Sequence, residues 1–114
     1  MIAQINANNK SFPVKFGMAA LSEFLDAENL QLGELDKIAS NLTLTRALRL
    51  VHLGMKHGAR VAGERFELSF EDVCDLMDEN PGLMQEVLDI FGKQMTAFSG
   101  NGQAPEKNPA KARK

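Results

Sequence analysis

The spacing of apolar positions changes once along the chain. Phe12, Val14 and Phe16 alternate with Pro13 and Lys15, which is the period of a half-buried strand. Asn8-Asn9-Lys10 tolerates the positive φ that a tight turn needs. Residues 2–16 are therefore predicted to form a β-hairpin.

After this segment the period becomes about 3.6, which is typical of helices with one apolar face. Helices are predicted at about residues 18–28, 33–39, 43–58, 69–79 and 81–98. Their inward-facing residues are expected to be Leu21, Phe24 and Leu25 in the first helix, Leu35 and Ile38 in the second, Leu44, Leu48, Val51 and Met55, widened by Ala47, Leu50 and Gly54, in the third, Phe70, Val73, Cys74 and Met77 in the fourth, and Leu83, Val87, Leu88, Phe91, Met95 and Phe98 in the fifth.

Several residues mark where these elements begin and end. Gly58, then Gly63, is expected to break the third helix. Gly17 is expected to turn the chain into the first helix. Pro13 cannot donate to a ladder, so the second strand is predicted to have a free edge there.

The last two helices carry their own start signals. Ser69 is a predicted N-cap, and Asp72 stands where the acid of a capping box would lie. Asn80 is expected to cap the last helix, with Pro81 at its first position. The acidic residues of the fourth helix are expected on its outer face, and they include Glu71, Asp75, Asp78 and Glu79.

Length and composition favour one small domain. The chain has 114 residues, of which 44% are hydrophobic. Residues 100–114 hold four basic residues and one acidic residue, so the net charge of −2 divides into +3 for this tail and −5 for the rest. We predict a mainly α fold of four to five helices with an N-terminal β-hairpin in residues 1–98, and a disordered basic tail in residues 99–114.

Cellular location and redox chemistry follow from what the sequence lacks. No run approaches the roughly 20 apolar residues of a membrane span, and the N-terminus does not match a signal peptide. Cys74 is the single cysteine, so no internal disulfide is expected. A packed thiol is favoured over a reactive one because no basic residue flanks it.

None of the candidate chemical sites indicates an enzyme or a bound cofactor. His52 and His57 are five residues apart, so on a helix they point roughly 140° away from each other, unlike a two-histidine metal face. The acidic residues between 71 and 79 lie on a predicted helix and not on a calcium loop. The same acids argue against a DNA-reading helix-turn-helix, since phosphate would repel them. No catalytic residue, no cofactor site and no metal site is expected.

Three segments carry a resemblance to a known family. The first runs from Ile5 to Phe24 and contains Phe-Pro-Val-Lys-Phe-Gly. The second runs from Ala47 to Gly58 and contains Gly-Met-Lys-His-Gly. The third begins Leu-Ser-Phe-Glu-Asp-Val at Leu68. Together, and in this order, they resemble the tail assembly chaperones of long-tailed phages and prophages.

The resemblance implies a non-enzymatic protein of the host cytoplasm that is absent from the mature virion. Such chaperones bind the tape measure protein, keep it soluble and help to recruit tail tube protein around it. The residues that contact these partners are unknown from sequence, although apolar surface on the third to fifth helices beside the acidic face is expected, and so is self-association as a homo-oligomer. No membrane and no specific nucleic acid is an expected partner. A structural adaptor protein of the phage particle is the main alternative, and a small DNA-acting regulator is a weaker one.

Overall fold

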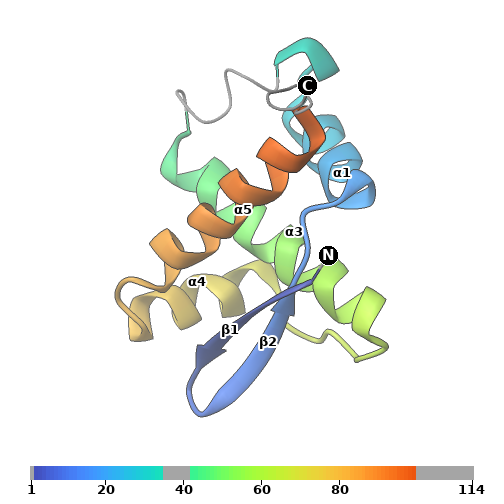
Figure 1. Ribbon diagram of the computed structural model, residues 1–114. Helices are drawn as coiled ribbons and strands as arrows, with labels where there is room; N and C mark the ends of the chain where they lie inside the picture. Colours follow the sequence, from blue (N-terminus) through green and yellow to red (C-terminus); the bar gives the residue numbers. More distant parts are fainter. Residues whose placement is uncertain (1, 35–41, 100–114) are drawn as a thin grey trace.

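The computed structural model describes residues 2–34 and 42–99. Within these ranges the chain is mainly helical, with an antiparallel β-hairpin at its N-terminal end (Figure 1), as the sequence predicts. The elements in order are β1 (Ala3–Ala7), β2 (Lys10–Val14), α1 (Met18–Glu28), the 3-10 helix η1 (Leu32–Glu34), α3 (Leu44–Ala62), α4 (Phe70–Glu79) and α5 (Leu83–Ser99).

The hairpin closes through a two-residue turn. Asn8 and Asn9 have φ values of 52° and 64°, as a type I′ turn requires. Ala7 lies opposite Lys10, at the turn end of the ladder. The Asn8 side chain donates to Glu79 Oε1 over 3.0 Å, so the tip of the hairpin is attached to the end of α4.

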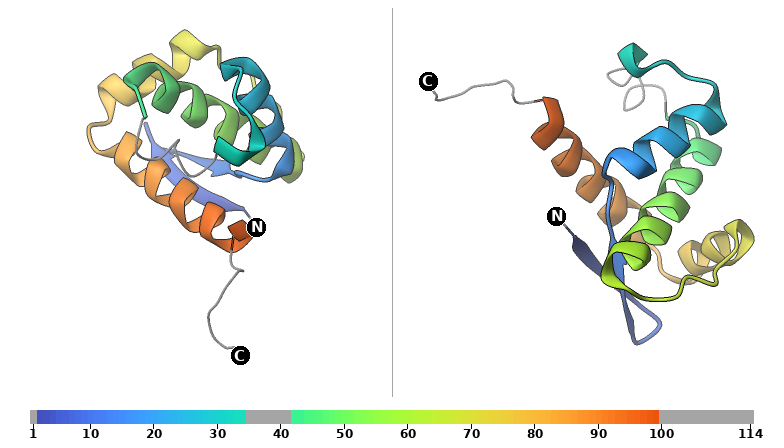
Figure 2. Two further views of the ribbon diagram at one scale, coloured as in Figure 1. Left: turned by 90° about the horizontal axis from the view of Figure 1, so that it is seen from above. Right: turned by 90° about the vertical axis from the view of Figure 1, so that its right-hand side faces the viewer.

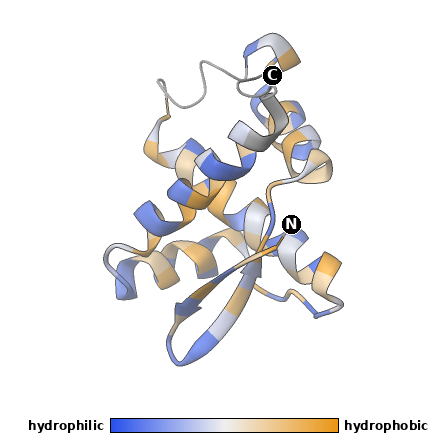
Figure 3. Ribbon diagram, in the orientation of Figure 1, coloured by the Kyte–Doolittle hydropathy of each residue, from blue (hydrophilic) through white to orange (hydrophobic). Residues whose placement is uncertain are grey.

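The hairpin lies between two helices. Viewed from above, α3 passes on one side of it and α5 on the other (Figure 2). Helix α3 packs on β2, and α5 packs on β1. Each helix carries both hydrophilic and hydrophobic positions (Figure 3). The buried hydrophobic residues of the helices and the hairpin form one core cluster. The fully buried side chains include Ile5, Val14, Phe16, Phe24, Leu50, Val51, Met55, Val73 and Val87.

Helix α3 is longer than predicted because Gly58 does not end it. The backbone of α3 approaches β2 so closely at Gly58 that a Cβ there would lie 2.2 Å from the Pro13 carbonyl oxygen. Glycine is therefore required by the contact and not by a break in the helix. The helix ends at Gly63, which adopts a left-handed conformation with φ of 77°.

The same contact corrects the prediction of a free edge on the second strand. Pro13 is buried, because α3 covers the strand at this point. The Lys15 N–H, one step beyond the strand, donates to the Gly54 carbonyl of α3 over 3.0 Å. The edge that the missing proline N–H would leave open is thus closed by a helix.

The inward face of α3 agrees with the prediction except at its first turns. Leu44 is 67% exposed, and Leu48 is only partly buried. Ala47, Leu50, Val51, Gly54 and Met55 are buried as predicted, and Gly58 joins them on this face. Glycine stands at positions 54 and 58 because the Phe16 ring and the Pro13 backbone come so near.

Of the remaining predictions for the helices, the bounds of α1 and the capping box of α4 are confirmed, and the start of α5 is wrong. Helix α1 has the predicted bounds and buries Leu21, Phe24 and Leu25. Ser69 and Asp72 form the predicted reciprocal capping box. Helix α5 begins at Leu83 and not at Pro81.

The late start of α5 follows from the turn before it. Gly82 has φ of 91°, which a helix cannot contain. Asn80 ends α4, and its side chain donates to the Leu76 carbonyl oxygen over 2.9 Å. The helix predicted at 33–39 overlaps η1 only at its start, and its remainder, like the tail at 100–114, lies outside the described residues.

Alanine at two glycines of the helices is expected to have opposite effects. In Gly58→Ala the new methyl group collides with the β2 backbone, so the free energy of unfolding should fall by about 3 kcal/mol. In Gly92→Ala the new methyl group would meet no atom within 4 Å, so this change in α5 should raise stability by about 0.5–1 kcal/mol. Urea denaturation of the three proteins measures both changes. Equal stability of Gly58→Ala and the unchanged protein would contradict the close contact.

Candidate functional site

A groove of about 450 Å³ runs between β2, the second half of α3 and the segment that leads to α4. Its apolar lining comprises Phe12, Pro13, Met55, Ala59, Phe66 and Leu68. Its charged lining comprises Lys10, Glu64, Arg65 and Glu67. The groove is therefore lined by apolar residues with charged residues of both signs beside them, and these charges sum to zero.

The outer wall of this groove is held in place by His52. The ring Nε2 of His52 lies 3.1 Å from the Leu68 carbonyl oxygen, which accepts the hydrogen bond. The ring also lies 5.4 Å from the Phe66 ring and 6.5 Å from the Phe70 ring, centroid to centroid. One helical histidine therefore contacts the segment before α4 at Phe66 and Leu68 and the first residue of α4, Phe70.

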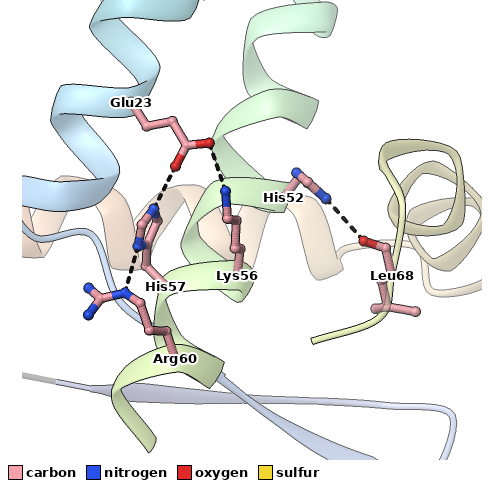
Figure 4. A network of polar contacts seen from close by, with 6 residues as sticks. All are labelled: Glu23, His52, Lys56, His57, Arg60 and Leu68. Atoms are coloured by element: carbon pink, nitrogen blue, oxygen red, sulfur yellow. Dashed lines mark hydrogen bonds and ion pairs between the residues drawn. The ribbon is translucent and has the colours of Figure 1, made fainter. Parts of the chain in front are cut away.

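A polar network joins α1 to the last turns of α3 (Figure 4). Glu23 accepts from Lys56 Nζ over 2.8 Å and lies 2.8 Å from His57 Nε2. Arg60 Nε donates to His57 Nδ1 over 3.1 Å. Since the guanidinium can only donate, Nδ1 must accept, and the proton of the neutral ring is on Nε2, which donates to Glu23.

The charges in this network act on the Glu23 carboxyl. The hydrogen bond from Lys56, followed by the one from His57, lowers the pKa of Glu23 below its ordinary value. The ionised form is therefore favoured in the folded state. His57 is buried and bonded at both ring nitrogens, so it serves as a link between the carboxylate and the guanidinium.

A second carboxylate fastens the other end of α1 to α3. Glu28 accepts from Arg46 Nε over 3.1 Å and also from Arg49. Burial alone would raise the pKa of Glu28, but the hydrogen bonds from Arg49 and Arg46 outweigh it and the pKa lies below its ordinary value. The basic face of α3 is thus largely used to hold α1 and is not a free cationic surface.

The apolar surface expected to be open on the third to fifth helices is taken up largely by the core. The apolar stripes of α3, α4 and α5 meet in the core, where Val51, Val73 and Val87 are fully buried. The acids of α4 are exposed as predicted. The open apolar groove lies at the hairpin instead. Sequence reasoning missed it, although Phe66 and Leu68 alternate with charged residues in the pattern of an extended segment with one apolar side.

Cys74 and the two histidines lie where the simpler interpretation places them. Cys74 is half-buried, and burial, followed by the nearby Glu71, Asp75 and Asp78, raises the pKa of its thiol. A raised pKa disfavours the nucleophilic thiolate. His52 and His57 belong to separate networks. Within residues 2–34 and 42–99, no three metal-ligating side chains gather into a metal site.

Comparison with known proteins adds no relative to this description. The chain matches no protein-family model, no curated protein and no solved structure. Among the described residues, none of the helices combines the length and the apolar character that crossing a membrane requires.

The Glu23 network should make stability depend on pH in a defined range. A lowered pKa in the folded state means that the carboxylate stabilises the protein above pH 4.5, its ordinary value, and that this contribution is lost as the pH falls through the lower, folded-state pKa. Replacing Glu23 with Gln should remove this acid-dependent part of the unfolding free energy. The effect should be small, below about 1 kcal/mol, because the side chain is 42% exposed and solvent screens the pair.

Thermal unfolding of both proteins between pH 3 and pH 7 measures this difference. Asp26→Asn is the matched control, because Asp26 is an exposed acid of the same helix with no ion pair among the described residues. The profile of Asp26→Asn should follow that of the unchanged protein. A Glu23→Gln profile parallel to the unchanged one at every pH would contradict the assigned role.

Proposed function

We propose that the protein is a tail assembly chaperone that binds the tape measure protein and keeps it soluble. In this proposal it also helps to recruit tail tube protein, acts in the host cytoplasm and is absent from the mature virion. It works by binding alone and has no catalytic step.

The first support is the resemblance of three segments to that family, together with the contacts between them. Gly54 and Gly58 of the second segment meet Phe16 and Pro13 of the first. His52 of the second segment binds the Leu68 carbonyl, where the third begins. The residues that carry the resemblance thus form one connected framework, as expected if they specify a common fold.

The observation that carries the proposal is the open apolar groove at β2. Phe12, Phe66 and Leu68 are only partly buried and line it together with Met55. A groove of this kind fits the apolar side of an amphipathic segment. A rim with both signs of charge accepts client helices of varied sequence without selecting one net charge.

Co-expression with the tape measure protein of the same phage or prophage tests the proposal. The tape measure protein should be soluble with the unchanged chain and should co-purify with it. Phe66→Ser should reduce the co-purified fraction about tenfold, since anchor residues of an interface typically contribute about 2 kcal/mol or more. Leu44→Ser is the matched control, because Leu44 is exposed but lies outside the groove.

The melting temperature of each variant separates loss of binding from loss of folding. Leu44→Ser should co-purify as the unchanged protein does. A tape measure protein that precipitates equally with and without this chain would refute the chaperone proposal. Detection of the chain in purified virions would favour the structural adaptor instead.

A further inference from the structure

A second hollow, of about 410 Å³, lies where α1 begins beside the last turns of α3. Its lining includes two cationic side chains, Lys15 and Arg60, and the buried His57. The rest is the start of α1, from Gly17 to Ala20. No acidic side chain is among the lining residues.

The Lys15 ammonium is placed over the start of the helix. Lys15 Cε lies 3.0 Å, and its Nζ 3.8 Å, from the position that a Cβ of Gly17 would occupy. A side chain at position 17 would press on the end of the lysine, so glycine leaves the ammonium room to lie here. Among the described residues Lys15 forms no ion pair, so its charge is not neutralised by a neighbour.

The Arg60 guanidinium is oriented by a hydrogen bond to His57. Its Nε is bound to His57, which is bound in turn to Glu23, so one side of the guanidinium is fixed by the network in Figure 4. Its terminal nitrogens pair with no described carboxylate. A guanidinium held in this way loses little conformational entropy when it binds a carboxylate in two-point geometry.

Backbone donors add to these two cations. The first hydrogen bond of α1 is donated by Leu21 to the Gly17 carbonyl over 3.0 Å. The N–H groups of Met18, Ala19 and Ala20 precede it and have no described partner. Residues with side-chain cations and residues with open backbone donors thus line one hollow, and no described carboxylate lines it.

We propose that this hollow binds a carboxylate of a protein partner. A carboxylate accepts from a guanidinium, an ammonium and backbone N–H groups at once, which are the donors present. Met18, at its edge, is 64% exposed and offers an apolar contact to the residues beside that carboxylate. The identity of the partner as a tail protein rests on the proposed function, whereas the carboxylate site does not.

Nuclear magnetic resonance of the full chain tests the site with a small probe. N-acetylglutamate α-amide, which carries one side-chain carboxylate, should shift the amide signals of Met18, Ala19 and Ala20 in a saturable manner. N-acetylglutamine α-amide is the matched neutral probe and should shift none of them. Lys15→Gln and Arg60→Gln should each weaken binding about tenfold, as expected for loss of one charge-assisted hydrogen bond.

Lys93→Gln is the control for net charge, because Lys93 is exposed on α5 and does not line the hollow. It should bind the probe as the unchanged chain does. Unchanged affinity in both hollow variants would overturn the site, and so would equal shifts with the neutral probe. Tighter binding of inorganic phosphate than of the carboxylate probe would overturn the carboxylate assignment. Because no tail protein is present, this test can succeed even if the chaperone proposal fails.

Discussion

The close approach of α3 to the hairpin is the contact on which the rest of the structure depends. At Gly58 the backbone of α3 rests on the backbone of Pro13, and at Gly54 it rests on the ring of Phe16. Phe16 then extends the contact to α5. Its ring meets Phe91 edge to face at 5.1 Å, and its N–H donates to Gln94 Oε1 over 2.6 Å. A helix, a strand and a second helix are thus joined around one aromatic residue.

The same approach determines where the surface is hollow. Pro13, Met55 and Ala59 lie beside the contact and form the floor of the groove at β2. Lys15 and His57 lie beside it as well and form part of the hollow at the start of α1. The two hollows therefore share the last turns of α3 and depend on one packing arrangement. A substitution such as Gly58→Ala is expected to disturb both of them.

The periodicity of the sequence is sufficient to predict the hairpin, α1 and the capping box of α4, because each depends on residues close together in the chain. The prediction that Gly58 ends a helix is wrong, since the reason for this glycine is a contact with Pro13 that local pattern does not contain. The groove escapes prediction because its lining comes from the hairpin, from α3 and from the segment before α4, which only the tertiary structure brings together.

The charged residues of α3 show how one helix supports two proposed contacts. Arg46, Arg49 and Lys56 are engaged by carboxylates of α1, which leaves Arg60, among the described residues, as the cation of this face whose terminal nitrogens are open. The Glu23 carboxylate of α1 orients the Arg60 guanidinium through His57. It does not neutralise the Arg60 charge, because Lys56 already balances the Glu23 charge. The apolar groove carries no such directional group. In the proposed division of roles, the groove therefore contributes affinity through apolar burial, and the carboxylate site fixes the orientation of the partner.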